Sequence, residues 1–182
     1  MLDDALLDVE QAVKQLDVAI RVMCYCERGD LDEERFNEDT TILLEQENVS
    51  VGSFRSHQDI ITASQINVSI CFGISAIALD AVFEVAGISP DPRLRNQKSE
   101  LRSLVYMVRC AFAHNPAYPQ WRANGDFARK LSIDLGQDLL SIDMVSLNGS
   151  IFDYSHIGGF ENWHKIRDMV VCECKGIEAV MK

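Results

Sequence analysis

The stretch SHQDIITASQINVSICFGISAIALDAVFEVAG, residues 56–87, decides the fold of this chain. No charged residue lies within residues 60–79, and apolar side chains occupy most sides of the helix that their spacing predicts. This uncharged run is long enough to raise the question of a membrane span. However, polar side chains interrupt it, and Asp80 and Glu84 follow it at once. We therefore predict a buried helix at the centre of a bundle, ended by Gly87, and no membrane segment.

Helices are also predicted on the N-terminal side of this stretch. Apolar residues recur every three or four positions from Leu2 to about Arg28, and Gly29 then ends the amphipathic helix that this spacing indicates. Residues 31–49 are predicted to form a weaker helix. Three of its apolar side chains are expected to face inward: Phe36, Leu43 and Leu44.

On the C-terminal side, a further helix is predicted to begin at about residue 91. Asp91 can cap it, and Pro92 suits the first helical position. The helical pattern continues to about Ala113, and Pro116 disfavours helical backbone at Asn115. We expect the helix to end there.

After Trp121 the apolar residues alternate with polar ones instead of following the helical period. Residues 131–135 and 141–144 show this alternation, which is typical of strands. Asn148-Gly149 is a strong hairpin turn, and residues 151–154 can form the returning strand. The segment therefore predicts a small antiparallel β-meander, and Trp121 is expected to anchor the preceding loop to the core.

The order of these elements predicts one mainly helical domain. The meander occupies about residues 130–155, and Gly158-Gly159 opens a last helix over about residues 162–180. No linker, internal repeat or low-complexity segment divides residues 1–182. We expect a helical bundle with the β-meander inserted before its last helix.

The charge of the chain is acidic but unevenly distributed. The net charge is −11, which argues against a general nucleic-acid binder. Residues 1–47 hold 14 carboxylates and 4 basic groups, whereas residues 93–130 hold eight basic and two acidic residues. A basic island therefore lies inside an acidic protein, and it covers the helix predicted to end at Ala113.

The six cysteines and the start of the chain indicate an intracellular protein. The N-terminus is acidic from its third residue, unlike a secretory signal. The two Cys-x-Cys pairs, at residues 24–26 and 172–174, do not have zinc-knuckle spacing. We expect buried free thiols, no metal and a cytoplasmic location.

Two stripes run along the helix predicted for residues 94–113. On a wheel of about 100° per residue, one stripe is an ordinary apolar core face. It contains Leu94, Leu101, Leu104, Val105, Val108 and Phe112. The second stripe borders the first and contains Arg95, Lys98, Arg102, Tyr106 and Arg109. An arginine at such an edge can present a fixed guanidinium to a phosphate.

His114 follows five residues after Arg109, which would place the two about 140° apart on an ideal helix. They can still converge in two ways. The stop imposed by Pro116 allows His114 to turn aside, or a second copy of the chain supplies the opposing group.

The segment RCAFAHN, residues 109–115, resembles the signature of HEPN domains, in which an arginine and a histidine are separated by four residues near the end of a bundle helix. The similarity in helix order covers most of residues 1–115 and 160–180. HEPN domains are compact helical bundles, usually dimeric, and many are metal-independent endoribonucleases of toxin–antitoxin and anti-phage systems. Their active site forms where two copies of the motif meet. Two features depart from the family: Cys110 stands where a polar residue such as Asn is frequent, and the strand-rich segment is an addition.

The resemblance implies cleavage of RNA by attack of a ribose 2′-hydroxyl on its own phosphate. His114 is then the proton carrier, because histidine exchanges protons near neutral pH, and Arg109 stabilises charge on the scissile phosphate. Arg102 and Tyr106 are implied to bind substrate by positioning its backbone or stacking a base, and Asn115 to orient the imidazole. No metal or cofactor is implied, and the partners are a second copy, RNA and a cognate antitoxin or other protein.

Structural roles for the same residues remain open from the sequence. Arg109 can pair with a carboxylate from the acidic first helix, and His114 can bond the last carbonyls of its own helix. Arg102 and Tyr106 can serve as a salt bridge and as edge packing. The alternative function is a non-catalytic dimerisation module that binds a protein or a nucleotide through the same surface. A third alternative is an unrelated helical regulator, in which the pair has no special role.

Overall fold

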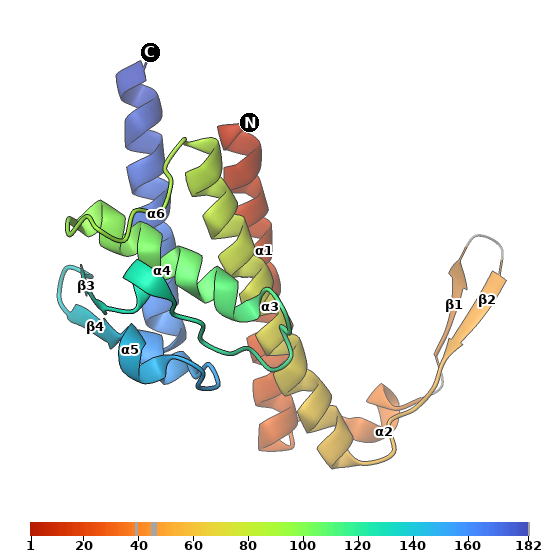
Figure 1. The fold of residues 1–182 in the computed structure, drawn as a ribbon. Helices are drawn as coiled ribbons and strands as arrows, with labels where there is room; N and C mark the ends of the chain where they lie inside the picture. Colours follow the sequence, from red (N-terminus) through yellow and green to blue (C-terminus); the bar gives the residue numbers. More distant parts are fainter. Residues whose placement is uncertain (39, 45–46, 182) are drawn as a thin grey trace.

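The computed structural model describes residues 1–38, 40–44 and 47–181, and it is mainly helical. Two long helices, α1 (Leu2–Arg28) and α3 (His57–Val85), pack side by side as an antiparallel pair (Figure 1). Gly29 ends α1 in the left-handed region at φ 70°, and the Ser56 side chain caps α3 by accepting from the Asp59 amide at 3.2 Å. Both helices confirm the bounds expected from the sequence.

Helix α3 is mostly buried, as expected, but Ile74 and Ile77 on one side of it are 48% and 49% exposed. It is the one helix of the described residues that is long and apolar enough to cross a membrane, and 61% of its most apolar window is buried in the protein. It packs against α1, α4 and α6. A bundle core helix has the same length and composition.

The prediction of a helix over residues 31–49 is wrong. The chain forms one helical turn, α2 (Glu33–Phe36), and then an antiparallel hairpin of β1 (Thr40–Leu44) and β2 (Glu47–Val51), with Ile42 opposite Val49. The residues of both strands are rich in Thr, Ile and Val, which favour strands over helix. The side chains of Leu43 and Leu44 lie outside the described part of the structure.

The segment between α1 and α3, here called the arm (α2, β1 and β2), projects away from the helical body (Figure 1). Phe36 is therefore not a core residue. Its side chain is 47% exposed, and its ring stacks on Phe54 with centroids 6.1 Å apart. The Asn37 side chain donates to the Phe54 carbonyl at 2.9 Å, which closes the base of the arm.

Helix α4 (Gln97–Phe112) begins later than expected and ends where expected. Its N-cap is Asn96, whose side chain accepts from the Ser99 amide at 2.9 Å. Asp91 instead caps a turn by accepting from the Arg93 amide at 3.0 Å. Leu94 consequently precedes the helix and is exposed, whereas the other members of the expected core stripe are buried.

The expected three-stranded meander is a two-stranded sheet. Strands β3 (Lys130–Asp134) and β4 (Leu139–Asp143) pair antiparallel, and their inward residues are buried in alternation. The third strand is wrong because the Asp143 side chain caps a helical turn, α5 (Met144–Leu147). Ile151 makes an isolated bridge to Gln120 instead of returning to β4.

Helix α6 (Gly159–Met181) closes the body, and aromatic side chains join it to α3. Phe72 contacts the rings of Phe112, Phe152, Tyr154, Phe160 and Trp163 at centroid distances of 4.7–6.2 Å. Trp121 is fully buried, and its indole donates to His156 Nδ1 at 3.0 Å. The predicted anchoring of this loop by Trp121 is confirmed.

All six cysteines are free thiols, as expected, but only Cys26, Cys71 and Cys174 are buried, so the expectation of buried thiols is wrong for the other three. Cys172 and Cys174 make a matched pair on α6. Cys172 is exposed, whereas Cys174 is buried and burial raises the pKa of its thiol to about 11. Because the thiolate is the reactive form, we expect N-ethylmaleimide to modify Cys172 much faster than Cys174 in the folded protein. Peptide mass spectrometry over time measures this, with the urea-unfolded chain as control. Equal rates in the folded protein would contradict the packing of α6.

Candidate functional site at the end of helix α4

The C-terminal end of α4 lies directly against α3. Gly73 of α3 makes this approach possible, because a Cβ atom at that position would lie 2.8 Å from Phe112 Cδ1. Beyond the helix, the Ser69 hydroxyl donates to the Pro116 carbonyl at 2.6 Å. Two contacts therefore hold the segment that carries His114 along α3.

A buried carboxylate organises the arginines of α4. Asp80 is 3% exposed, and its side chain forms an ion pair with Arg102, which is itself 1% exposed. Arg102 also donates from Nε to the Ile88 carbonyl at 2.9 Å, and its guanidinium lies 5.2 Å from the centre of the Phe83 ring. Arg102 is thus bound within the core, which matches the salt-bridge alternative and leaves it no access to a substrate.

The same carboxylate also faces Arg109. Arg109 Nε lies 3.7 Å from Asp80 Oδ2, and 41% of the Arg109 side chain remains exposed. Burial acts to lower the pKa of Arg109, but its hydrogen bond to Cys110 and the charge of Asp80 outweigh burial and raise this pKa above its ordinary value. Asp80 therefore fixes a permanent cation at the surface of α4.

Tyr106 lies between Arg102 and Arg109 in the sequence, and its ring packs against neighbouring side chains. Its ring centroid is 5.1 Å from that of Phe127, and the Arg102 guanidinium lies 5.8 Å from it. A hydrogen bond to Cys110 raises the pKa of the Tyr106 phenol. These contacts match the expected edge packing, and they also place Cys110 beside both Tyr106 and Arg109.

His114 and Asn115 lie just beyond the helix. Ala113 is the C-cap, so the 140° separation of an ideal helix does not apply to His114. The His114 side chain is exposed, and within residues 1–38, 40–44 and 47–181 no hydrogen bond or ion pair joins it to Arg109. Asn115 Oδ1 accepts from the amides of Ala117 and Tyr118 at 3.2 and 3.3 Å, so this oxygen holds the turn and does not orient the imidazole.

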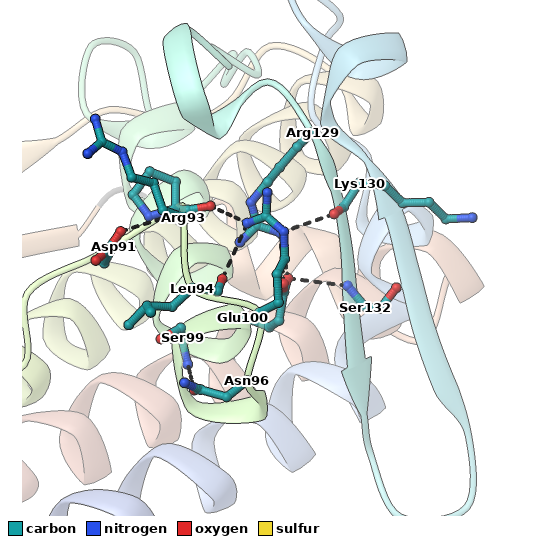
Figure 2. A network of polar contacts seen from close by, with 11 residues as sticks. Asp91, Arg93, Leu94, Asn96, Ser99, Glu100, Arg129, Lys130 and Ser132 are labelled. Carbon is teal, nitrogen blue, oxygen red and sulfur yellow. Dashed lines mark hydrogen bonds and ion pairs between the residues drawn. The ribbon is translucent and has the colours of Figure 1, made fainter.

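Four of the eight basic residues in residues 93–130 form ion pairs, and they share three carboxylates. Arg102 and Arg109 face Asp80, and Arg93 lies 3.1 Å from Asp126. Figure 2 shows the fourth pair, in which the buried Glu100 accepts from Arg129 Nη1 at 2.8 Å. The same carboxylate accepts from the Ser132 amide at 3.4 Å, which ties β3 to α4. Much of the basic character inferred from the sequence is therefore structural.

The two buried carboxylates are the residues of the candidate site and its surroundings that sequence reasoning missed. Asp80 lies 22 residues before its partner Arg102, and Glu100 lies 29 residues before Arg129, so no local spacing relates them. A signal was nevertheless present for Asp80, because an acid between apolar residues on the most apolar helix needs a buried cation. No cluster of His, Cys, Asp and Glu suited to a metal ion occurs in the described residues.

The geometry thus provides a half-exposed guanidinium on α4, paired with Asp80, and an exposed imidazole just after the helix. Within the described part of the chain, no hydrogen bond or ion pair joins these two groups. Comparisons with protein-family models, with curated proteins and with solved structures gave no match for this chain.

Proposed function

We propose that this chain is a metal-independent endoribonuclease of the HEPN type, acting in the cytoplasm as a toxin or an anti-phage component. The observation that carries the proposal is the exposed imidazole of His114, which has no hydrogen-bond or ion-pair partner among the described residues and lies just after the helix on which Asp80 pairs with Arg109. A structural histidine normally satisfies its ring nitrogens within the protein, as His156 does with Trp121. The motif residues 109–115 add the resemblance to the family.

The proposed site takes two copies of the chain, because no hydrogen bond or ion pair joins Arg109 to His114 within the described residues of one copy. A two-fold arrangement brings two guanidinium and two imidazole groups to one phosphate. One imidazole takes the proton of the ribose 2′-hydroxyl, the 2′-oxygen bonds to phosphorus, and the P–O5′ bond breaks. The other imidazole, protonated, gives its proton to the leaving 5′-oxygen. The products are a 2′,3′-cyclic phosphate and a 5′-hydroxyl, and Arg109 stabilises the charge on the phosphate oxygens.

A non-catalytic binding module is the second candidate, and one observation favours it. Asp80 competes with any phosphate for Arg109, and the net charge of −11 repels RNA outside the immediate surroundings of the motif. In this case the same surface binds a protein such as an antitoxin, and the chain cuts nothing.

Cleavage of RNA in the presence of EDTA tests the proposal. We expect the purified chain to cut a 5′-labelled single-stranded RNA at neutral pH and to leave 2′,3′-cyclic phosphate ends. His114→Ala, purified in the same way, controls for contaminating ribonucleases. No cleavage, cleavage that requires a divalent metal, or equal cleavage by the variant would contradict the proposal. A cleaving monomer in light scattering would contradict the shared site.

A further inference from the structure

A small cleft opens beside the loop that follows His114. It has a volume of about 280 Å³ and lies between the N-terminal half of α3, the loop over residues 117–119, and residues 151–154. Tyr118 and Ile151 line it and are 62% and 67% exposed, so both form its rim. Phe152 and Tyr154, which belong to the aromatic cluster of the core, also line it.

The protein holds this cleft in place at several points. Asn115 Oδ1 accepts from the Tyr118 amide at 3.3 Å, and Ser69 donates to the Pro116 carbonyl at 2.6 Å. On the other wall, the Phe152 amide donates to the Pro119 carbonyl at 2.9 Å. The rim residues are thus presented by backbone that is bonded on both sides, which is the preorganisation that a binding site needs.

The contacts of α4 and its loop place His114 between Arg109 and the cleft. Along α3, Arg109 faces Asp80, Phe112 faces Gly73, Pro116 faces Ser69, and Tyr118 shares the cleft with Gln65. Asp80 and Gln65 are 15 residues apart, which corresponds to about 22 Å of helix. An RNA strand that follows this path passes the guanidinium of Arg109 first, then the segment that carries His114, and then the cleft.

We propose that this cleft binds one nucleobase of a single-stranded RNA whose scissile phosphate lies at the proposed site shared by two copies. Drug-sized ligands fill about 300–1,000 Å³, so the cleft suits a smaller group. A flat base fits between an aromatic and an aliphatic side chain, and stacking on an exposed tyrosine requires no particular sequence. Thr62, Gln65 and Ser69 of α3 add polar groups to the lining. The assignment to RNA rests on the proposed function, because it is the proximity of His114 that selects a nucleic acid over a peptide.

Binding measured without cleavage tests this assignment separately from catalysis. Each variant is made in the full-length His114→Ala background, and the probe is a fluorescent single-stranded RNA of six nucleotides in EDTA. We expect Tyr118→Ala to raise the Kd about ten-fold, since base stacking on one aromatic ring contributes a factor of this order. Tyr118→Phe should bind as the parent does, and Ile151→Ala should weaken binding to a smaller extent. Tyr25→Ala removes a tyrosine of similar exposure (56%) from α1 and should leave the Kd unchanged.

The outcomes separate this inference from the proposed function. Loss of binding in Tyr118→Ala together with no cleavage by the wild-type chain would support the cleft and refute the nuclease. Cleavage by the wild type with an unchanged Kd in Tyr118→Ala would overturn the cleft and leave the nuclease intact. If Tyr118→Ala instead changes the oligomeric state in light scattering, the cleft is a contact between copies and the inference is wrong. Competition by cytidine and adenosine monophosphates, but not by inorganic phosphate, is the expected sign of a base site.

Discussion

We expect His114→Ala to lower the rate of RNA cleavage by about 10²–10⁴-fold, which is the usual contribution of a positioned proton carrier. The fold should be unaffected, because His114 is exposed and lies outside α4, and its side chain has no hydrogen bond or ion pair within the described residues. The free energy of unfolding should change by less than about 0.5 kcal/mol. Initial rates under single-turnover conditions in EDTA, with urea unfolding in parallel, measure both quantities.

His164 offers a matched control for this substitution. It lies on α6, is 30% exposed at its side chain, and has Asp17 as a partner at 3.3 Å. His164→Ala removes the same side chain from the same protein and should retain full activity. If both alanine variants cleave equally well, or if His114→Ala loses activity only because it unfolds, His114 has no part in catalysis.

We expect Asp80→Ala to destabilise the protein by about 3–5 kcal/mol, the usual effect of removing one partner of a buried ion pair. Arg102 is the reason, because its guanidinium is 1% exposed and would keep only the Ile88 carbonyl as a bonded oxygen. For a chain of this length the loss corresponds to a fall in Tm of roughly 6–20 °C. Urea and thermal unfolding followed by circular dichroism measure it.

Two comparisons distinguish a buried charge from a general effect of losing a carboxylate. Asp126→Ala breaks the exposed pair with Arg93, whose side chain is 82% exposed, and should cost less than about 1 kcal/mol. Asp80→Leu combined with Arg102→Met replaces both charges by apolar groups and should recover much of the loss. An Asp80→Ala variant as stable as Asp126→Ala would show that Arg102 is solvated, contrary to its burial.

The long helices were predictable because apolar residues recur at helical spacing over many consecutive turns. In α1 and α3 the apolar residues continue over the whole element, and Gly29 ends α1 as expected. The Ser56 cap of α3 is a finding of the structure. Short elements lack this redundancy. The predicted start of α4 is too early because Asp91 and Pro92 suit a turn as well as they suit the start of a helix. Asn96 is the residue that caps α4, and the two candidate caps differ in the contacts that the fold gives them.

Errors elsewhere came from partners distant in the sequence. Ile151 has the composition of a strand residue, but its bridging partner is Gln120 and not β4. In the candidate site, Arg109 and His114 were found from their local motif, whereas Asp80 was not, because only the packing of α3 on α4 brings it to the arginines. Arg102 was likewise expected at the edge of the core, but it is buried. A helical wheel gives the direction in which a side chain points, but it does not show which distant segments of the chain cover that side chain.

The arm has a consequence for how such a chain can change over evolutionary time. Glu27 of α1 accepts from Gln65 of α3 at 2.9 Å, so the helical pair is already tied together before the chain turns outward. Closing a loop depends only logarithmically on its length, about 0.6 kcal/mol for each doubling. Insertions in the arm, deletions from it, or its replacement by another segment should therefore change the stability of the bundle very little. We expect descendants of this protein to vary most in this excursion, while the lengths of α1 and α3 stay constant.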